Sequence, residues 1–491
     1  VIRTARAMGI RTVAVYSDAD KDSRHVEMAD EAVPIGPPPS AQSYLVIERI
    51  VKACQDTGAE AVHPGYGFLS ENPAFCAALE KDGIVFIDPK APPMEAMGDK
   101  IASKKLALAA KVRTIPGHNS AIATAEEAIA IAKGIGYPVM IKASAGGGGK
   151  GLRVAYDDVQ CREGFASCRN EAKSAFGDDR VFIEKFVEDP RHIEIQVLGD
   201  AHGNVVYLNE RECSIQRRHQ KVIEEAPSPF LDDATRIAMG EQAVQLARAV
   251  QYQSAGTVEF VVDRHKAFYF LEMNTRLQVE HPVTEAITGL DLVELMIRVA
   301  AGERLPLAQK DVRRNGWAIE CRINAEDPFR NFLPSSGRVV KFMPPPEIPG
   351  QVRVDTGMYE GGEVSMYYDS MIAKLICHGA TRDVAIARMR EALNAFVIRG
   401  VASNIAFQAA LMQHPRFVAG DFNTGFIAEA FPKGFHAATA VHEDPLLLAA
   451  VAALARRRYI ARAVQISGRL RGHQRIVGHD WVVMLGAQRF A

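Results

Sequence analysis

Residues 270–281 read Phe-Leu-Glu-Met-Asn-Thr-Arg-Leu-Gln-Val-Glu-His, and this stretch carries the most specific pattern in the chain. Five polar residues alternate there with apolar residues and a threonine: Glu272, Asn274, Arg276, Gln278 and Glu280. Side chains of a β-strand alternate between its two faces, so a strand over residues 272–280 would place all five on one face. A salt-bridged sheet face also alternates, but it rarely mixes acids, amides and a guanidinium so tightly. We therefore expect a functional face here.

The expected face contains the ligands for a divalent metal ion. Glu259, in the sequence Gly-Thr-Val-Glu-Phe, lies one predicted hairpin upstream and is expected beside Glu272 on the neighbouring strand. Two carboxylates and an amide oxygen suit Mg²⁺, which binds few protein oxygens and shares its other positions with phosphates and water. Glu259, Glu272 and Asn274 are therefore the predicted metal ligands. Farther along the face, Arg276 and Gln278 are expected to orient a small anion, with Glu280 as a base.

A glycine run, Ala145–Gly151, is the most conspicuous local feature. It fits the dinucleotide-binding spacing formally, but that motif needs a helix next, and residues 152–156 read as a strand. A Walker A loop fails as well, because Ser144 and Gly151 stand where a glycine and a Ser/Thr are required. The pattern predicts a strand–loop–strand flap that closes over phosphates, with Lys142 adding a cation; a flexible surface turn is the alternative.

Other segments add weaker signals. Gln216–Lys221 gathers basic groups without interleaved aromatic residues, which favours an anion pocket over a nucleic-acid patch. A lone histidine such as His219 is more often structural. Glu184–Phe186 resembles a strand-to-loop segment that reads a purine through its backbone, and Cys321–Asp327 places Arg322 at a strand end. An interdomain salt bridge is the alternative role for that arginine.

Length and composition bound the class of protein. The 491 residues correspond to roughly three domains, and 48% hydrophobic with 24% charged residues is ordinary globular composition. The formal net charge of -1 argues against a general nucleic-acid-coating role. The longest apolar run is far short of a bilayer span, no signal-peptide pattern opens the chain, and the 7 cysteines never form CxxC. We expect a soluble intracellular protein, and we expect the chain to be a fragment that is cut at both ends.

The order of predicted elements gives the fold class. Strands at 12–16, 61–63 and 84–87 alternate with helices at 44–54 and 73–81, which implies parallel βαβ units. Helices are expected at 99–111 and 124–134, and strands at 138–142 and 152–156. Residues 181–330 read mainly as strands with helices at 233–250 and 290–302. A mixed block to about 430, a linker at 434–444 and a helix at 445–458 follow.

Together, several motifs resemble biotin carboxylase, an ATP-grasp enzyme, in unbroken order over about residues 1–430. They are His63–Asn72, Met97–Lys100, the glycine loop, Arg191–Gln196, Gln216–Lys221, Glu272–His281 and Cys321–Asp327. The segment after about 435 resembles the partner-binding domain in α subunits of acyl-CoA carboxylases, propionyl-CoA carboxylase most closely. The alternatives are methylcrotonyl-CoA, acetyl-CoA or pyruvate carboxylase, another ATP-grasp ligase such as a carbamoyl-phosphate type, and a binding scaffold without turnover.

The resemblance implies a fold of α/β and α+β class in four parts. Residues 1–98 would form a Rossmann-like N-terminal domain that lacks its first strand. Residues 99–312 would form the ATP-grasp domain, with a glycine-loop lid at about 116–185. Residues 313–432 would form a mixed C-terminal domain, and 433–491 the start of a subunit-interaction domain.

The resemblance also assigns roles to individual residues. The nucleotide would contact Lys100, Lys142, Gly147, Gly148, Glu184, Lys185, His192, Gln216, His219 and Glu259, and Mg²⁺ or Mn²⁺ would bind Glu259, Glu272 and Asn274. Bicarbonate would be surrounded by Lys221, Arg276, Gln278 and the backbone of Val279, with Glu280 as its base. Biotin would meet Tyr66, Gly67 and Arg322. The implied catalytic residues are Glu280, Arg322, Lys221 and Arg276.

The implied reaction is ATP-dependent carboxylation of biotin by bicarbonate through carboxyphosphate. No Met-Lys-Met stretch occurs in the chain, so biotin is expected on a carrier domain beyond residue 491 or on another chain. A carboxyltransferase β subunit is the expected partner, in a large α–β hetero-oligomer without nucleic acid or membrane. The location would be the bacterial cytoplasm, or the mitochondrial matrix in a eukaryote.

Overall fold

The computed structural model describes residues 1–118, 120–145, 151–436, 444–465 and 477–491, which form two compact units, Val1–Phe435 and His436–Ala491. Gly147 and Gly148 of the predicted glycine loop lie outside the described residues. Among the described helices, none combines the length and apolar character that crossing a bilayer requires.

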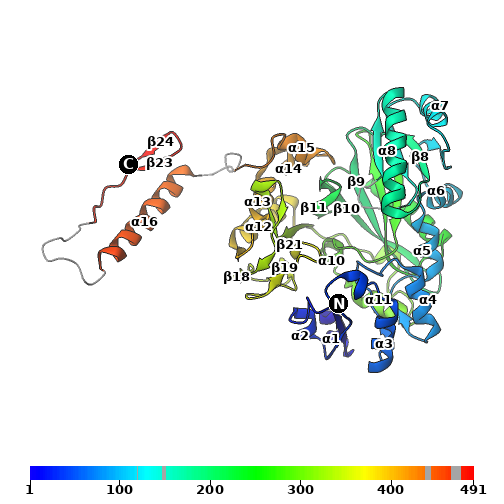
Figure 1. Ribbon diagram of the computed structural model, residues 1–491, viewed down its shortest axis with the longest axis horizontal. Helices are drawn as coiled ribbons and strands as arrows, with labels where there is room; N and C mark the ends of the chain where they lie inside the picture. The colour runs from blue at the N-terminus through cyan, green and yellow to red at the C-terminus, as the bar shows by residue number, and fades with distance from the viewer. Residues whose placement is uncertain (119, 146–150, 437–443, 466–476) are drawn as a thin grey trace. The chain divides into compact units, whose positions relative to one another are not determined.

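The first unit begins with short helices and short parallel strands, as the alternating pattern predicts (Figure 1). They are α1 (Ile2–Ala7), β1 (Val13–Tyr16), α2 (Arg24–Met28), β2 (Glu31–Pro34), α3 (Ile47–Thr57), β3 (Ala61–Val62), α4 (Pro73–Lys81), β4 (Val85–Phe86), α5 (Ala91–Gly98) and α6 (Lys100–Ala109). β1 pairs with β2 and β3 with β4, in two separate two-stranded parallel sheets. Asn72 begins α4 by accepting a hydrogen bond from the Phe75 N–H, and Asp99 begins α6 in the same way.

A small antiparallel sheet contains the strands on either side of the glycine run. Its elements are β5 (Gly117–His118), α7 (Ala125–Ile135), β6 (Val139–Ala143), β7 (Leu152–Ala155), α8 (Asp158–Phe176) and β8 (Val181–Lys185), with strand order β5-β8-β6-β7. β6 and β7 are antiparallel neighbours, which confirms the predicted strands on either side of the glycine run. The side chains of Ile141 and Phe165 belong to the core between this sheet and its two helices.

An eight-stranded antiparallel sheet forms the centre of the unit (Figure 1). Its strands, in spatial order, are β13 (Phe268–Asn274), β12 (Ser254–Val262), β9 (Arg191–Gly199), β10 (Val205–Arg217), β11 (Gln220–Ala226), β14 (Trp317–Asn324), β21 (Met371–Gly379) and β19 (Val352–Asp355). The helices that accompany it are α9 (Asp233–Ala249), α10 (His281–Thr288), α11 (Leu292–Ala300) and α12 (Arg382–Ala395).

Strand β9 shows how this sheet separates its core from its site. Ile193, Ile195 and Val197 join the core cluster that contains residues of α9. Because side chains alternate along a strand, the intervening His192, Glu194 and Gln196 project from the opposite face. That face is also buried, with Glu194 and Gln196 fully covered. Buried polar groups must be hydrogen-bonded to one another, so this face becomes a connected polar network.

The single extended ribbon predicted over residues 272–280 is wrong beyond Asn274, where β13 ends. Asn274 is still paired with Thr257 of β12, but the N–H of Thr275 donates to the Glu71 carboxylate instead of to a strand. The chain then turns into α10, with Glu280 at the N-cap and Pro282 in the first turn. Proline favours a helix start, and this signal competes with the period-two pattern.

The remaining elements complete both units. In the first unit they are β15 (Glu326–Asp327), β16 (Leu333–Pro334), β17 (Gly337–Arg338), β18 (Lys341–Met343), β20 (Glu363–Val364), β22 (Val397–Arg399), α13 (Ile405–Gln413), α14 (Pro415–Val418) and α15 (Phe426–Ala430). The second unit consists of α16 (Pro445–Val464) and the hairpin of β23 (Val483–Leu485) and β24 (Gln488–Phe490). Asp444 begins α16 by accepting a hydrogen bond from the Leu447 N–H.

Candidate active site

A cleft of about 1180 Å³ runs across the polar face of the large sheet. It brings together nearly all the described residues that the sequence singles out: Lys100, Lys142, Glu184, His192, Gln216, His219, Lys221, Glu259, Glu272, Asn274, Arg276, Gln278, Val279, Glu280 and Arg322. Residues distant in sequence therefore share one cleft.

Three predicted residues do not line this cleft. The Nζ of Lys185 donates to the carbonyls of Gly136 and Tyr137, 2.9 and 3.0 Å away, so its side chain is directed to a turn beside β6. Tyr66 and Gly67 lie in the turn after β3, and the Tyr66 ring is 40% exposed. Partial burial raises the pKa of the Tyr66 phenol to about 12, while the nearby Arg322 guanidinium acts to lower it.

The predicted metal ligands lie on one face of the β12–β13 hairpin. Glu259 is directly opposite Glu272 in the ladder, as expected, and Asn274 follows Glu272 on the same face. Glu259 Oε1 accepts from Asn274 Nδ2 at 2.8 Å, while Lys100 Nζ lies 3.7 Å from Glu272 Oε2. Two carboxylates and an amide oxygen at the cleft wall are a hard-oxygen set, so the donor chemistry fits Mg²⁺ or Mn²⁺.

His192 lies close enough to these ligands to contribute to the same site. Its Nε2 is 3.0 Å from Glu259 Oε2, and ligand atoms of His192, Glu194 and Glu259 lie within 4.8 Å of one another. Burial alone would lower the pKa of His192, but Glu259 outweighs it and the net shift is upward. The carboxylate of Glu259 thus favours the protonated form of the imidazole, whereas a metal ion would need the neutral form.

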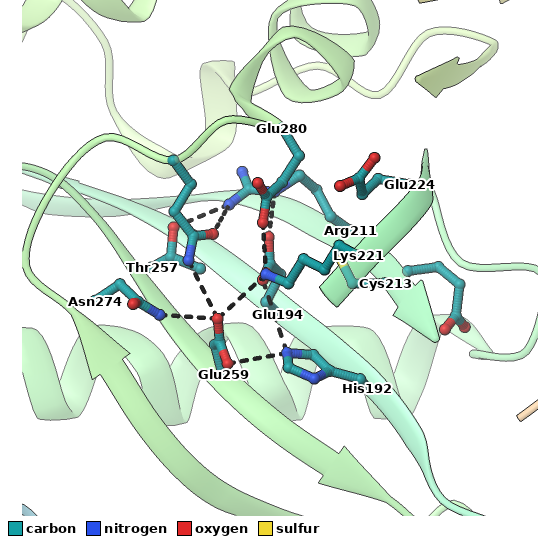
Figure 2. Close-up of polar contacts among 12 residues, drawn as sticks. His192, Glu194, Arg211, Cys213, Lys221, Glu224, Thr257, Glu259, Asn274 and Glu280 are labelled. Carbon is teal, nitrogen blue, oxygen red and sulfur yellow. Dashed lines mark hydrogen bonds and ion pairs between the residues drawn. The ribbon is translucent and has the colours of Figure 1, made fainter. Parts of the chain in front are cut away.

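Lys221 links three carboxylates at the middle of the cleft (Figure 2). Its Nζ donates to Glu194 Oε2 at 2.6 Å, to Glu259 Oε1 at 3.2 Å and to Glu280 Oε1. Arg322 contacts the other oxygen of Glu280 at 2.9 Å. Burial would raise the pKa of Glu280, but Lys221, Arg322 and Arg211 outweigh it and hold that pKa well below its usual value.

Arg211, a residue that the sequence interpretation missed, contacts this group through Glu194 (Figure 2). It is fully buried and donates to Glu194, Gln196, Thr257, Gln278 and Thr284. Because Arg211 occupies the Gln278 oxygen at 3.0 Å, the Gln278 amide nitrogen is directed to Glu259 at 3.1 Å. The signal for Arg211 was present in the alternating Glu-Arg-Glu of residues 210–212, inside an otherwise buried strand.

A second buried charge cluster lies in the cleft around Glu184. Lys142 Nζ lies 2.6 Å from Glu184 Oε2, and Lys104 contacts the other Glu184 oxygen. Lys104, on α6, was not predicted because a lysine in an amphipathic helix reads as solvent-exposed, yet its side chain is 2% exposed. Burial is the main reason that the pKa of Lys104 falls to about 6, and the neighbouring Lys142 lowers it further.

The turn between β10 and β11 presents the predicted basic segment. Arg218 and His219 both have positive φ, which lets the two strands reverse tightly, and His219 is exposed at the tip. Gln216 lies just before the turn, 3.0 Å from His192 Nδ1. At the other end of the cleft, the carbonyl of Val279 accepts from Lys374 Nζ at 2.7 Å.

Glu320 has no hydrogen-bond partner for either carboxylate oxygen in the described structure, although it is fully buried. Burial raises its pKa to about 8; Lys374 opposes this shift, and Glu224, directly opposite on β11, adds to it. Between about pH 4.5 and about pH 8, Glu320 is therefore protonated in the native protein but ionised in the unfolded chain. The resulting stabilisation is complete at low pH and is lost as the pH rises from about 4.5 to about 8.

We accordingly expect Glu320→Gln to gain stability relative to the wild type as the pH increases from 5.5 to 8.5. The slope for one proton is at most about 1.4 kcal/mol per pH unit. Urea unfolding of both proteins at three pH values measures how the difference between their free energies of unfolding changes with pH. A difference in free energy of unfolding that is independent of pH would contradict the assignment.

Comparisons with known proteins match successive parts of the chain to four family models. Residues 1–94 match the N-terminal domain of biotin carboxylase, and residues 99–308 the ATP-binding domain of the carbamoyl-phosphate synthase L chain. Residues 320–429 match the C-terminal domain of biotin carboxylase, and residues 448–491 the BT domain of propionyl-coenzyme A carboxylase.

Whole-chain relatives and solved structures agree with these models. The propionyl-CoA carboxylase alpha chain of Ruegeria pomeroyi is 60% identical, over 100% of this chain and 75% of its own length. The human mitochondrial alpha chain is also 60% identical, over 91% of this chain and 62% of its own length. This chain thus spans 62% to 75% of the length of these relatives.

Two crystal structures resemble the fold closely. Biotin carboxylase from Campylobacter jejuni has a TM-score of 0.85 at 45% identity, over 87% of this chain and 95% of its own. The biotin carboxylase domain of Hydrogenobacter thermophilus 2-oxoglutarate carboxylase, in complex with MgADP and bicarbonate, has a TM-score of 0.84 at 46% identity, over 90% of this chain and 96% of its own. With a relative 60% identical over the whole chain, this protein belongs to the biotin carboxylase family of ATP-dependent ligases, among the propionyl-CoA carboxylase alpha chains.

Proposed function

We propose that this chain catalyses the carboxylation of biotin by bicarbonate at the expense of ATP, as the first half-reaction of propionyl-CoA carboxylation. The observation that carries the assignment of roles is the link of Lys221, Glu280 and Arg322 in the same cleft as the Glu259–Glu272 pair. A base, a hydrogen-bond donor for an oxyanion and a divalent-metal site are thereby within reach of one reacting centre.

The bicarbonate subsite would consist of Lys221, Arg276, Gln278 and Glu280. Two cations and an amide surround a small anion, and a carboxylate is held beside it to accept a proton. Bicarbonate is a weak nucleophile until its hydroxyl proton is removed. Glu280 would take that proton while the bicarbonate oxygen attacks the γ-phosphorus of ATP, which releases ADP and forms carboxyphosphate.

The ion pairs around Glu280 control the basicity of its carboxylate. In the free protein Lys221 and Arg322 hold the pKa of Glu280 well below its usual value, which weakens it as a base. An incoming bicarbonate anion competes for the same two cations and adds its own negative charge. Both effects would raise the pKa of Glu280, so proton transfer from bicarbonate becomes less unfavourable when the subsite is filled.

The nucleotide would lie at the end of the cleft that contains Lys100, Lys142 and Glu184. Glu259, Glu272 and Asn274 would hold Mg²⁺ or Mn²⁺, which when bound neutralises phosphate charge. The lysines would supply further positive charge along the phosphates, and His192 and Gln216, which contact each other at the cleft wall, would lie between nucleotide and bicarbonate. Phosphoryl transfer needs positioning and charge stabilisation more than covalent catalysis by the protein.

Arg322 would act on biotin. Carboxyphosphate decomposes to CO₂ and phosphate, and the phosphate removes the proton from biotin N1′, which then attacks CO₂. Negative charge develops on the ureido oxygen during this step. The guanidinium of Arg322, held by Glu224 at 2.6 Å and Glu280 at 2.9 Å, is preoriented to stabilise that charge, with Tyr66 and Gly67 shaping the approach.

For the metal ligands we expect Glu272→Gln to raise the Mn²⁺ concentration needed for half-maximal binding by roughly tenfold or more, because it removes one of two anionic ligands. Titration of the protein with Mn²⁺, followed by its paramagnetic effect on water relaxation, measures this directly. Glu241→Gln, an exposed substitution on α9, is the matched control. Equal Mn²⁺ affinity in Glu272→Gln and wild type would remove Glu272 from the ligand set.

Phosphate release from ATP in the presence of bicarbonate tests the activity itself. We expect release to increase severalfold on addition of free biotin. Release that responds to ammonia or carbamate but not to biotin would identify a carbamoyl-phosphate-type ligase instead. Nucleotide binding without any release would identify a scaffold.

The partners are proposed on the same basis. The match of residues 448–491 to a BT domain supports a carboxyltransferase β subunit as partner, in a large α–β hetero-oligomer. The four-part division at about residues 98, 312 and 432, a separate biotin carrier domain, and a bacterial cytoplasmic or mitochondrial matrix location belong to this proposal. Purification of the native complex with its companion chain tests them together.

A further inference from the structure

Glu71 reaches from the N-terminal part of the chain into the loop that follows β13. Its Oε1 accepts hydrogen bonds from the N–H of Thr275 at 2.9 Å and from the Thr275 hydroxyl at 3.2 Å. Its Oε2 accepts from Nε of Arg276 at 2.8 Å. One carboxylate thus holds both the backbone and the side chain of consecutive residues that are about 200 positions away in sequence.

These contacts occur where the strand ladder stops. Asn274 is the last residue of β13, and the next N–H is satisfied by Glu71 instead of by β12. Glu71 therefore caps the strand and fixes the point at which the chain turns toward Glu280. Without this acceptor, the Thr275 N–H would need a new partner, and the loop that carries the bicarbonate residues would lose its anchor.

The same carboxylate orients the Arg276 guanidinium. Because Nε donates to Glu71, the plane of the guanidinium is fixed at the cleft wall, and one terminal nitrogen donates to the Leu277 carbonyl at 3.5 Å. The other terminal nitrogen donates to Oδ1 of Asn274 at 3.2 Å, and Asn274 is itself one of the proposed metal ligands. A planar cation held along one edge offers its other donors in a defined direction, which is what recognition of a small planar anion requires.

We propose that Glu71 is a positioning residue for bicarbonate, acting through Arg276 and the strand end at Thr275. The proposal rests on the proposed function of this cleft. Glu71 comes from the same turn region as Tyr66 and Gly67, which are expected to approach biotin. Docking of the N-terminal region would therefore set the bicarbonate-binding guanidinium and the biotin-facing turn together.

A stabilising surface ion pair is the competing explanation for Glu71. Its side chain is 40% exposed, and exposed ion pairs contribute little to stability, so substitutions there should leave the fold intact. A positioning role predicts a selective kinetic change instead. Glu80→Ala provides a matched control, because Glu80 lies in the same region, pairs with Lys90 at 3.0 Å and is similarly exposed at 45%.

The test measures biotin-dependent phosphate release by the full chain. We expect Glu71→Ala to raise the KM for bicarbonate about tenfold or more, with the KM for ATP within twofold of wild type. Glu71→Gln keeps an acceptor oxygen but loses the charge, so its KM for bicarbonate should lie between those of the wild type and Glu71→Ala. Glu71→Ala combined with Arg276→Ala should be no worse than Arg276→Ala alone, since Glu71 acts through that arginine.

Each outcome discriminates. Absence of biotin-dependent release in the wild type would refute the proposed function itself. An active wild type with an unchanged bicarbonate KM in Glu71→Ala, or additive effects in the double variant, would refute the role of Glu71. If Glu71→Ala loses its native circular dichroism, the comparison of Glu71→Gln with wild type decides, and equal bicarbonate KM values there would refute the proposal.

Discussion

Glu280→Gln is expected to lower kcat for biotin carboxylation by about 10²–10⁴-fold, the range typical for loss of a general base. The substitution keeps the size of the side chain and one acceptor oxygen for Lys221 or Arg322. It removes the group that accepts the bicarbonate proton, so the attacking oxygen stays a poor nucleophile. Binding of the nucleotide should persist, because Lys100, Lys142 and the Glu259–Glu272 pair are untouched.

Two measurements separate loss of chemistry from loss of binding. Phosphate release should be nearly absent with and without biotin, whereas the Kd for MgADP, from calorimetry, should stay within about threefold of wild type. The Glu241→Gln protein serves again as a fully active reference. Turnover within a factor of about ten of wild type would show that Glu280 is not the base.

Arg322→Ala is expected to reduce biotin-dependent turnover by about 10²–10³-fold, the range typical for loss of one hydrogen-bond donor that stabilises an oxyanion. Arg322→Lys should restore little of it, because a lysine cannot reproduce the bridge between Glu224 and Glu280 and still face the ureido oxygen. The slow bicarbonate-dependent release of phosphate without biotin should survive, since carboxyphosphate formation does not use this arginine. That split distinguishes an effect on biotin from a general failure of the site.

The loss of Arg322 also affects Glu224, and a double variant controls for this effect. Arg322 neutralises the fully buried Glu224, so its removal leaves an unpaired charge that can disturb the site. The double variant Arg322→Ala/Glu224→Gln removes that charge. If the double variant recovered wild-type biotin-dependent turnover, the loss in Arg322→Ala would be electrostatic strain, and the oxyanion role would be abandoned.

The sequence predicted correctly those elements that are marked by residues lying close together in the chain. The helix at Pro73–Lys81 was predicted with its observed bounds, because a capping asparagine and an N-terminal proline mark its start. The strands around the glycine run and the pairing of Glu259 with Glu272 were also predicted correctly. Each of these depends on residues that are close in sequence or joined by one hairpin.

The predictions failed where a distant group competed with the local pattern. The period-two alternation of residues 272–280 continues past Asn274, yet the strand does not, because Glu71 takes the next N–H and α10 begins soon after. Arg211, Lys104 and Glu194 were not assigned roles for a related reason. A charged residue in a sequence gives no sign that it is buried until its partners, from other strands and helices, are in place.

The amino-acid sequence by itself determined the chemistry of this protein: which acids, amides and cations are available, that a glycine loop follows a lysine-bearing strand, and which family the motifs resemble. Only the tertiary structure decided how these groups are coupled. It placed Lys221 between three carboxylates, turned Gln278 toward Glu259 through Arg211, and tied Arg276 to Glu71. The physical reason is that a side chain's charge state and orientation depend on burial and on neighbours, and those neighbours come from strands that are far apart in the chain.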